Sequence, residues 1–219
     1  MARGPRTPKP GPLIIGHRGF AARFPDNSLA GVRAALAAGA DGVEVDVRPC
    51  AEGAWVCHHD RTRRRRPIEA WPLDRLRRAG VPLLDEVVGT VPEGRWVYVE
   101  VKPLAADRLA AHVHELAGVL AGCRARVRVI SSSLNVLAEV GHALGVVPTS
   151  LVFGELPEWL PGDIDFSPKH TLVEDLIPLR RPLHPWTVNR RSRMIELVDL
   201  GVASITTNRP DLAVETLRG

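Results

Sequence analysis

Three carboxylates lie on two short apolar stretches of this sequence, and their spacing could bring them together. Glu44 and Asp46 alternate with valines, so in an extended chain both point to one side. Glu100 and Lys102 alternate with a second set of valines in the same way. Buried carboxylates that face one another repel unless a cation or basic groups lie between them. An all-oxygen set of this kind suits a hard divalent cation, Mg²⁺ or Ca²⁺.

Two histidines follow apolar stretches of the same kind, and imidazole is the side chain that titrates near neutral pH. His17 closes the first apolar stretch, and His59 follows a short extension of the second. Together with the carboxylates they fit a general acid and a general base. Arg18 and Lys102 would then supply positive charge for a phosphoryl group. Spacing alone leaves open a structural network in which these two basic residues neutralise the acids.

The elements that must position these residues alternate between short apolar strands and amphipathic helices. The predicted strands, most of them rich in valine and isoleucine, span Leu13–His17, Gly42–Val47, Trp96–Lys102, Arg126–Ser131, Val147–Phe153, Asp163–Phe166, Leu183–Val188 and Ala203–Thr207. The predicted helices span Asn27–Ala38, Leu73–Ala79, Leu84–Val91, Asp107–Leu120, Ser133–Leu144, Arg190–Leu200 and Pro210–Leu217. We expect Asn27 or Asp26 to cap the first helix.

Eight strands, each followed by helix-like sequence, favour an α/β fold, a single small (β/α)₈ TIM barrel without a large inserted domain. The three carboxylates should then converge on the barrel axis, near the carboxyl ends of the strands. A doubly wound open sheet is the alternative, but no glycine-rich phosphate fingerprint follows the first strand. We expect residues 1–12 to be a disordered lead-in and residues 13–219 to form the barrel domain.

Composition indicates the class of protein and the cellular compartment to expect. The 219 residues are 45% hydrophobic and 25% charged with a formal net charge of +4, which indicates a soluble globular protein with a mild bias toward anionic partners. No apolar run approaches the roughly 20 residues of a membrane span, and residues 1–12 lack the apolar core of a secretory signal. An odd number of cysteines without metal spacing adds to the expectation of a cytoplasmic protein with reduced thiols.

The sequence carries one dense basic run, Arg61–Arg66, directly after His59 and Asp60. It is either a solvated loop or a basic segment that attracts anionic ligands, and composition leaves both possibilities open. The run has no interleaved aromatic residues and matches no nucleic-acid-binding motif, so nucleic acid is not the expected partner. Peripheral contact with a membrane and the oligomeric state stay open.

An ordered set of short motifs resembles the glycerophosphodiester phosphodiesterase family of metal-dependent (β/α)₈ barrels. Each motif alone is unspecific, but the set follows the family's order from Leu13 to about Leu217. The motifs are Gly16-His17-Arg18-Gly19, Pro25-Asp26-Asn27-Ser28, Gly42-Val43-Glu44-Val45-Asp46-Val47, His59-Asp60, Pro82-Leu83-Leu84-Asp85-Glu86-Val87, Val99-Glu100-Val101-Lys102, Trp186-Thr187-Val188-Asn189 and Thr206-Thr207-Asn208-Arg209-Pro210-Asp211.

The resemblance implies hydrolysis of a small glycerophosphodiester to glycerol 3-phosphate and an alcohol, an activity of lipid and glycerol metabolism. It also implies a role for each matching residue: acid–base catalysis by His17 and His59, cation binding by Glu44, Asp46 and Glu100, phosphate contact by Arg18 and Lys102, and a pocket wall at Trp186. For Trp186 the alternative is a core residue, and Asn27 is expected to be a helix cap more than a catalytic group.

Two departures from the family pattern bear on the substrate. Asn208 stands where the family commonly has aspartate, and the segment after His59 is shortened and replaced by arginines. The reaction type should survive these changes better than the choice of alcohol. Two alternatives remain: a related barrel that acts on lysophospholipid or sphingomyelin head groups, and a catalytically silent phosphate-binding barrel. The physiological metal, and the choice between water attack and a cyclic phosphate intermediate, cannot be read from the sequence.

Overall fold

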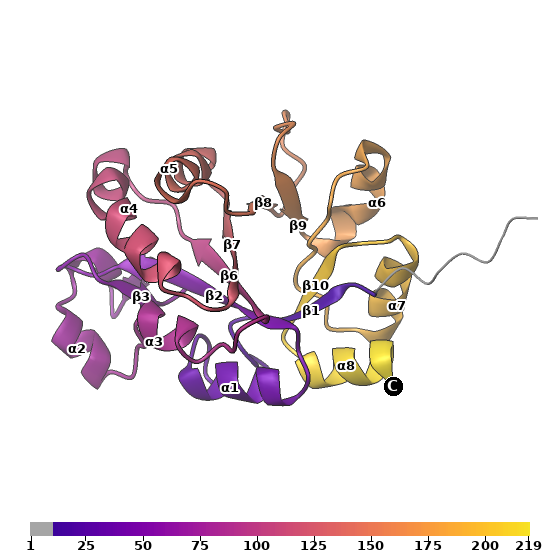
Figure 1. Cartoon of the computed structure of the whole chain (residues 1–219), viewed down its shortest axis with the longest axis horizontal. Coiled ribbons are helices and arrows are strands. Elements are labelled where there is room, and N and C mark those ends of the chain that lie inside the picture. Colours follow the sequence, from indigo (N-terminus) through magenta and orange to yellow (C-terminus); the bar gives the residue numbers. More distant parts are fainter. Residues whose placement is uncertain (1–10) are drawn as a thin grey trace, which may run out of the picture.

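Parallel strands and helices alternate along the chain in this computed structural model, which describes residues 11–219 (Figure 1). The parallel strands lie in the order β10-β1-β2-β6-β7-β8-β9. They span β1 Leu13–Gly16, β2 Gly42–Pro49, β6 Trp96–Val101, β7 Arg126–Ser131, β8 Thr149–Phe153, β9 Asp165–Pro168 and β10 Ser204–Thr207. The strands curl around a common centre with the helices outside them, which confirms the predicted TIM-barrel class. Of the predicted lead-in, residues 1–10 lie outside the described part.

The sequence between β9 and β10 closes the barrel without forming a regular strand. Residues 183–188 form single parallel bridges to β9 and its end, at Phe166↔Leu183 and Lys169↔Trp186. On the other side, the Val188 amide donates to the Thr206 carbonyl at 2.9 Å. Pro185 has no N–H and cannot take part in a continuous ladder. The predicted strand Leu183–Val188 is therefore an extended segment in the barrel wall.

Two smaller strand pairs extend the connection that follows β2. The strand β3, Trp55–Cys57, pairs antiparallel with the end of β2. Beyond His59, β4 (Thr62–Arg63) and β5 (Arg66–Pro67) form a two-stranded hairpin of their own. This connection is the longest one in the described chain and lies at the carboxyl end of the barrel strands.

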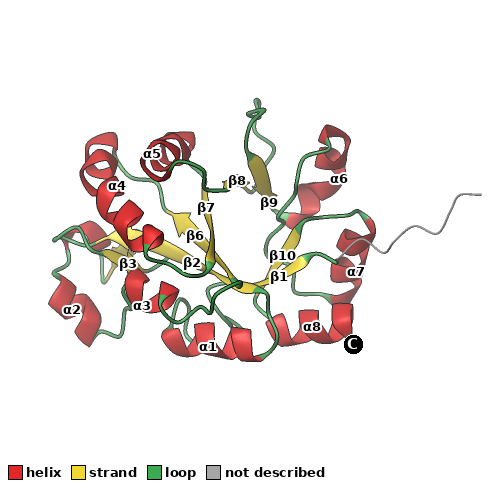
Figure 2. Cartoon of the chain, viewed as in Figure 1, coloured by secondary structure: helices red, strands yellow, loops and turns green. Residues whose placement is uncertain are grey.

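Helices cover the outside of the barrel at every connection but one. They span α1 Leu29–Ala37, α2 Leu73–Arg78, α3 Leu84–Val88, α4 Ala106–Ala121, α5 Leu134–Leu144, α6 Val173–Leu176, α7 Arg191–Asp199 and α8 Pro210–Arg218. The expectation that every strand is followed by a helix is wrong between β8 and β9, where residues 154–164 form a loop (Figure 2). Pro157, Pro161 and two glycines in that loop disfavour a helix. Among the described helices, none combines the length and the apolar character needed to cross a bilayer.

The N-cap of the first helix lies one residue later in the sequence than the predicted Asn27. Ser28 is the N-cap of α1, and its hydroxyl accepts a hydrogen bond from the Gly31 amide at 3.1 Å. The prediction that Asn27 or Asp26 caps this helix is therefore wrong. Asn27 is buried and has a left-handed backbone with a φ of 59°, so its side chain is free for another task.

The core has two layers, because alternate residues of each strand face opposite sides. The outer layer packs strand valines against the helices, with Val43, Val45, Val97 and Val99 in one cluster with Leu109 of α4. The inner layer lies on the barrel axis and holds a second apolar cluster, Ile15, Tyr98, Ile130 and Val152. Polar residues on that inner face point away from the helices, as the alternation predicts.

A buried polar network spans the barrel axis below the apolar inner cluster. Arg128 of β7 donates to Asp165 of β9 at 2.7 Å and to the Ser150 hydroxyl at 2.8 Å. His184 lies 3.4 Å from the same Asp165 carboxylate and 2.8 Å from the Ser204 hydroxyl. Burial opposes ionisation of Asp165, but the His184 and Arg128 hydrogen bonds outweigh it and lower the pKa of this carboxyl.

We expect Asp165→Asn to destabilise the fold at neutral pH, because Arg128 keeps its buried charge and loses its carboxylate partner. The loss should fall near the lower end of the roughly 3–5 kcal/mol typical of broken buried pairs. A carboxyl with a lowered pKa stabilises the fold above its unfolded pKa, and that contribution is lost as pH falls through the folded pKa. The difference between parent and variant should therefore shrink below about pH 4.

Urea unfolding at pH 7 and at a series of acidic pH values measures this difference. Asp163→Asn is the matched control, because Asp163 is exposed in the same segment and has no ion pair within the described residues. Equal stability of Asp165→Asn and the parent at pH 7 would contradict the expectation.

Candidate active site

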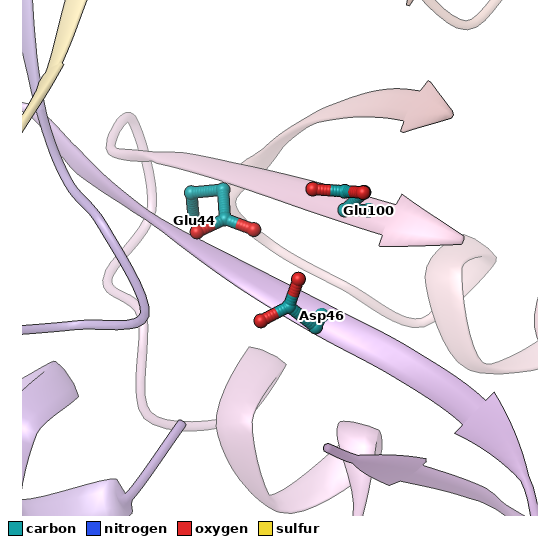
Figure 3. A group of neighbouring side chains, drawn as sticks. All are labelled: Glu44, Asp46 and Glu100. Atoms are coloured by element: carbon teal, nitrogen blue, oxygen red, sulfur yellow. The ribbon is translucent and has the colours of Figure 1, made fainter. Parts of the chain in front are cut away.

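The three predicted carboxylates meet on the inner face of two neighbouring strands. Glu44 and Asp46 of β2 and Glu100 of β6 point toward one another (Figure 3). Asp46 is directly opposite Glu100 in the parallel register. One oxygen from each carboxylate lies within 4.8 Å of the other two. The alternation of acids and valines thus places all three side chains as the sequence predicts.

Burial, mutual repulsion and basic neighbours shift the pKa values of the three carboxyls in different directions. Burial, with the charges of Asp46 and Glu100, raises the pKa of Glu44 well above its usual range. Burial also raises the pKa of Glu100, although Lys102 opposes the shift. For Asp46 burial acts in the same direction, but Lys102, Asn27 and Arg18 outweigh it and lower the pKa. Glu44 therefore carries the largest uncompensated cost of ionisation.

Basic groups neutralise part of this cluster. The Lys102 ammonium lies 2.7 Å from Asp46 and 2.5 Å from Glu100, and the Arg18 Nε lies 3.2 Å from Asp46. Arg18 also donates to Asp26 at 2.6 Å. The structural network considered from the sequence is thus present, but it reaches only two of the three acids. Glu44 Oε1 is buried and has no hydrogen-bond partner among the described residues.

The turn after β1 places Arg18 over the carboxylates. Arg18 has a φ of 50°, and its amide donates to Glu44 Oε2 at 2.9 Å. Gly16 and Gly19 flank the turn, and neither could carry a side chain without a clash. A Cβ on Gly16 would lie 2.3 Å from the Gly19 carbonyl oxygen, and one on Gly19 would lie 2.7 Å from the Gly31 backbone. The glycines thus permit the close approach of this turn to α1.

Asn27 holds Asp46 from both sides. Its side-chain amide donates to Asp46 Oδ2 at 2.9 Å, and its Oδ1 accepts from the Asp46 amide at 3.0 Å. These two bonds fix the carboxylate and help to keep it ionised. Sequence reasoning missed this role, because an asparagine just before a helix is more often a cap.

His17 is mostly buried beside Glu44. Its Nδ1 lies 2.6 Å from Asn208 Oδ1, and its Nε2 lies 3.8 Å from Glu44 Oε2. Because the amide oxygen accepts, Nδ1 is the donor, and in the neutral ring Nε2 carries the free electron pair. Burial lowers the pKa of His17, although the Asn208 hydrogen bond opposes the shift. The ring is therefore neutral near pH 7 and can accept a proton at Nε2.

His59 lies on the opposite, more open side of the site. Its side chain is 41% exposed, and Nδ1 is 2.9 Å from Asp60 Oδ1. The hydrogen bond from His59 lowers the pKa of Asp60, and this carboxylate orients the imidazole ring. Asp60 is a second residue whose role sequence reasoning missed, although its place directly after His59 was the available signal.

A pocket of about 280 Å³ joins these groups at the mouth of the barrel. Its charged and polar lining includes His17, His59, Arg18, Lys102, Glu44 and Glu100, and its apolar lining includes Tyr98, Ile130 and Val152. Trp186 forms part of the wall and donates through its indole N–H to the Ser167 carbonyl at 2.8 Å. The pocket therefore combines a charged end with an apolar end, and Trp186 belongs to it.

Comparison with known sequences decides which family this site belongs to. The sequence model of the Glycerophosphoryl diester phosphodiesterase family matches residues 17–130, slightly more than half of the chain. The chain belongs to this family. The family is one of phosphoric diester hydrolases, as the motifs of the sequence predict.

Whole-chain relatives of this phosphodiesterase family agree with the assignment. A Mycobacterium tuberculosis protein named probable glycerophosphodiester phosphodiesterase 1 is 26% identical to this chain. The match covers 91% of this chain and 90% of the relative. A glycerophosphodiester phosphodiesterase of Caldanaerobacter subterraneus is 25% identical over 94% of this chain and 98% of its own.

Solved structures share the fold at lower sequence identity. A phosphodiesterase from Oleispira antarctica, solved with its product sn-glycerol-3-phosphate, superposes with a TM-score of 0.86 at 18% identity and covers 95% of this chain and 98% of its own. A glycerophosphoryl diester phosphodiesterase homologue from Silicibacter pomeroyi gives 0.81 at 21% identity, with coverage of 95% and 94%. Both likenesses concern the barrel and not the details of the site.

Proposed function

We propose that this family member hydrolyses small glycerophosphodiesters to glycerol 3-phosphate and an alcohol, with a divalent cation bound by Glu44, Asp46 and Glu100. One observation carries the proposal: within the described residues, Glu44 of the carboxylate triad keeps a buried oxygen without a hydrogen-bond partner, in a pocket that also contains His17 and His59. The names of the relatives supply the substrate class.

The residues present fit a hard divalent cation such as Mg²⁺ or Ca²⁺. All three donors are carboxylate oxygens, which such ions prefer. The basic groups of the site leave Glu44 uncompensated, and a cation would stabilise its ionised form. When bound, the cation would neutralise a non-bridging phosphate oxygen and lower the pKa of a hydroxyl or water at the site.

The chain's own residues would bind the phosphate and transfer the protons. Arg18 and Lys102 line the pocket and would hold the phosphate, while Asn27 and Asp26 keep the acid and the guanidinium in place. His17 would act as the general base, because its neutral Nε2 faces the carboxylate end of the pocket. His59 would act as the general acid and donate a proton to the leaving alkoxide, since it lines the open side of the pocket and Asp60 orients its ring.

The size of the pocket favours a water-soluble diester over a lysolipid. At about 280 Å³ it accommodates a glycerol phosphate and a small alcohol. Trp159 and Leu156 are 66% and 48% exposed in the loop after β8, but neither lines the pocket. The soluble class is therefore the substrate that the geometry supports best.

Removal of metal should abolish hydrolysis of glycerophosphocholine, and added Mg²⁺ or Ca²⁺ should restore it. The measurement is choline release by protein treated with a chelator and checked by elemental analysis, with each ion returned in turn. A panel of glycerophosphodiesters and lysophospholipids then tests the substrate class. Full activity of metal-free protein would refute the metal assignment, and cleavage of lysolipids alone would overturn the soluble substrate. Absence of any hydrolysis with metal would favour a silent barrel.

A further inference from the structure

A second cleft opens at the same end of the barrel as the proposed active site. It has a volume of about 630 Å³ and lies between the long connection after β2 and the loop that leads into α4. Arg48, Arg61 and Arg108 line it, and Glu69 is the one carboxylate of its lining. The cleft therefore carries an excess of positive charge beside the phosphodiester pocket.

Arg48 links this cleft to the carboxylate triad. It follows Glu44 and Asp46 on the same face of β2, and at about 3.3 Å per residue its Cα lies roughly 7 Å beyond that of Asp46. Arg48 is 7% exposed, and the nearest carboxylate oxygen, Glu69 Oε1, lies 3.4 Å from its Nη1, which is a long contact for an ion pair. Its Nε donates to the His59 backbone carbonyl at 3.2 Å, which joins the cleft to the proposed general acid.

The other two guanidinium groups are exposed and have no counter-charge. Within residues 11–219, no carboxylate lies within 4.0 Å of the Arg61 or the Arg108 guanidinium. The cleft also borders the amino-terminal end of α4, whose N-cap Ala105 offers no side-chain bond to the first turn. Free backbone N–H groups and guanidinium groups both favour an oxyanion. Asp107 in that first turn is the opposing charge, and it is not among the residues that line the cleft.

The basic run seen in the sequence adds further positive charge near this cleft. Arg64 and Arg65 form the turn between β4 and β5, with φ values of 48° and 64°. This left-handed turn normally favours asparagine and glycine, so arginine at both positions costs backbone energy. Within the described chain, neither arginine has a carboxylate partner. The backbone conformation does not favour arginine at these positions, and their two positive charges add to the positive potential near the cleft.

We propose that the cleft binds a phosphate monoester carried on the alcohol part of the substrate, so that the enzyme prefers diesters whose alcohol bears a second phosphate. The proposal rests on the proposed function, because the diester must lie at the carboxylate triad. Arg48, Arg61 and Arg108 would contact the second phosphate. Charge-assisted contacts of this kind give a preference of about tenfold in kcat/KM.

The test compares glycerophosphoglycerol with the same diester bearing a terminal phosphate monoester, in the metal-loaded enzyme. The parent should prefer the phosphorylated diester about tenfold, and high salt should reduce this preference. Arg61→Gln and Arg108→Gln should each lower the ratio of the two kcat/KM values, and the double variant should bring it close to one. Arg33→Gln is the matched control, since Arg33 is exposed on α1, has no ion pair in the described chain and lies outside the cleft.

Three outcomes overturn the assignment. They are a parental ratio near one, a ratio that both variants keep, and a ratio that Arg33→Gln lowers equally. If inorganic phosphate alters turnover of the plain diester in the parent but not in the double variant, while the ratio is one, the cleft takes free phosphate instead. If the parent hydrolyses neither diester, the proposed function fails separately. Thermal melts with inorganic phosphate then test the cleft, and equal stabilisation of parent and double variant overturns it.

Discussion

Replacing His17 or His59 with alanine should lower turnover of glycerophosphocholine by about 10²–10⁴-fold, the usual effect of losing a general acid or base. The two variants should differ when the leaving group is changed. With the p-nitrophenyl ester of glycerol phosphate the departing p-nitrophenolate needs no proton, so His59→Ala should recover most of its rate. His17→Ala should stay slow with both substrates, because the attacking nucleophile still needs a base.

The control for this pair is His114→Ala. His114 is exposed on α4 and is not part of the lining of the active-site pocket, so its loss should leave turnover unchanged. Melting temperatures of all three variants should stay near the parental value. If either variant hydrolyses glycerophosphocholine at the parental rate, the replaced histidine is not a general acid or base. An equal deficit of His59→Ala on both substrates would assign the acid to another residue.

The barrel could be predicted from the sequence because strand alternation and helix periodicity are local signals. Seven strands lie within a few residues of their predicted ranges, and so do the helices other than α6, for which no helix was predicted. The other failures arise where prolines and glycines interrupt the pattern. Residues 183–188 alternate like a strand, but Pro182 and Pro185 leave only single bridges. The loop after β8 occupies a helix position because its prolines and glycines cannot form the turns that the barrel pattern implies.

The site was predictable to the extent that its residues lie on strands. The positions of Glu44, Asp46 and Glu100 follow from a period of two and one parallel register. Asn27 and Asn208 could not be assigned in that way, because each acts across a turn on a residue far along the chain. Tyr98 shares the inner face with Glu100, so the same alternation could have placed it in the pocket. The cleft at Arg48 depends on how two long connections pack, and no local pattern reports that.

The two interpretations of the carboxylate cluster predict different results for Glu44 and Glu100, because these residues have different partners. Glu100 pairs with the Lys102 ammonium, whereas Glu44 Oε1 has no partner and the pKa of Glu44 is raised well above its usual range. A group with a raised carboxyl pKa destabilises the fold once it must ionise at neutral pH. A bound cation should reverse this effect and stabilise the parent.

Glu44→Gln should therefore be inactive at ordinary metal concentrations, yet unfold no earlier than the metal-free parent. Glutamine keeps the volume and can still accept the Arg18 amide, but it removes the charge that repels Asp46 and Glu100. Glu100→Gln is the contrasting variant. It should melt below Glu44→Gln, because Lys102 loses one of its two carboxylate partners.

Thermal melts of the parent and both variants, with and without Mg²⁺ or Ca²⁺, measure these differences. Added cation should raise the melting temperature of the parent and have little effect on Glu44→Gln. If Glu44→Gln melts well below the metal-free parent while the parent ignores the cation, Glu44 is a structural residue of an ion-pair network. The two carboxylates share one inner face, but of the two Glu100 alone pairs with the Lys102 ammonium, and this basic partner should make their glutamine variants differ in stability.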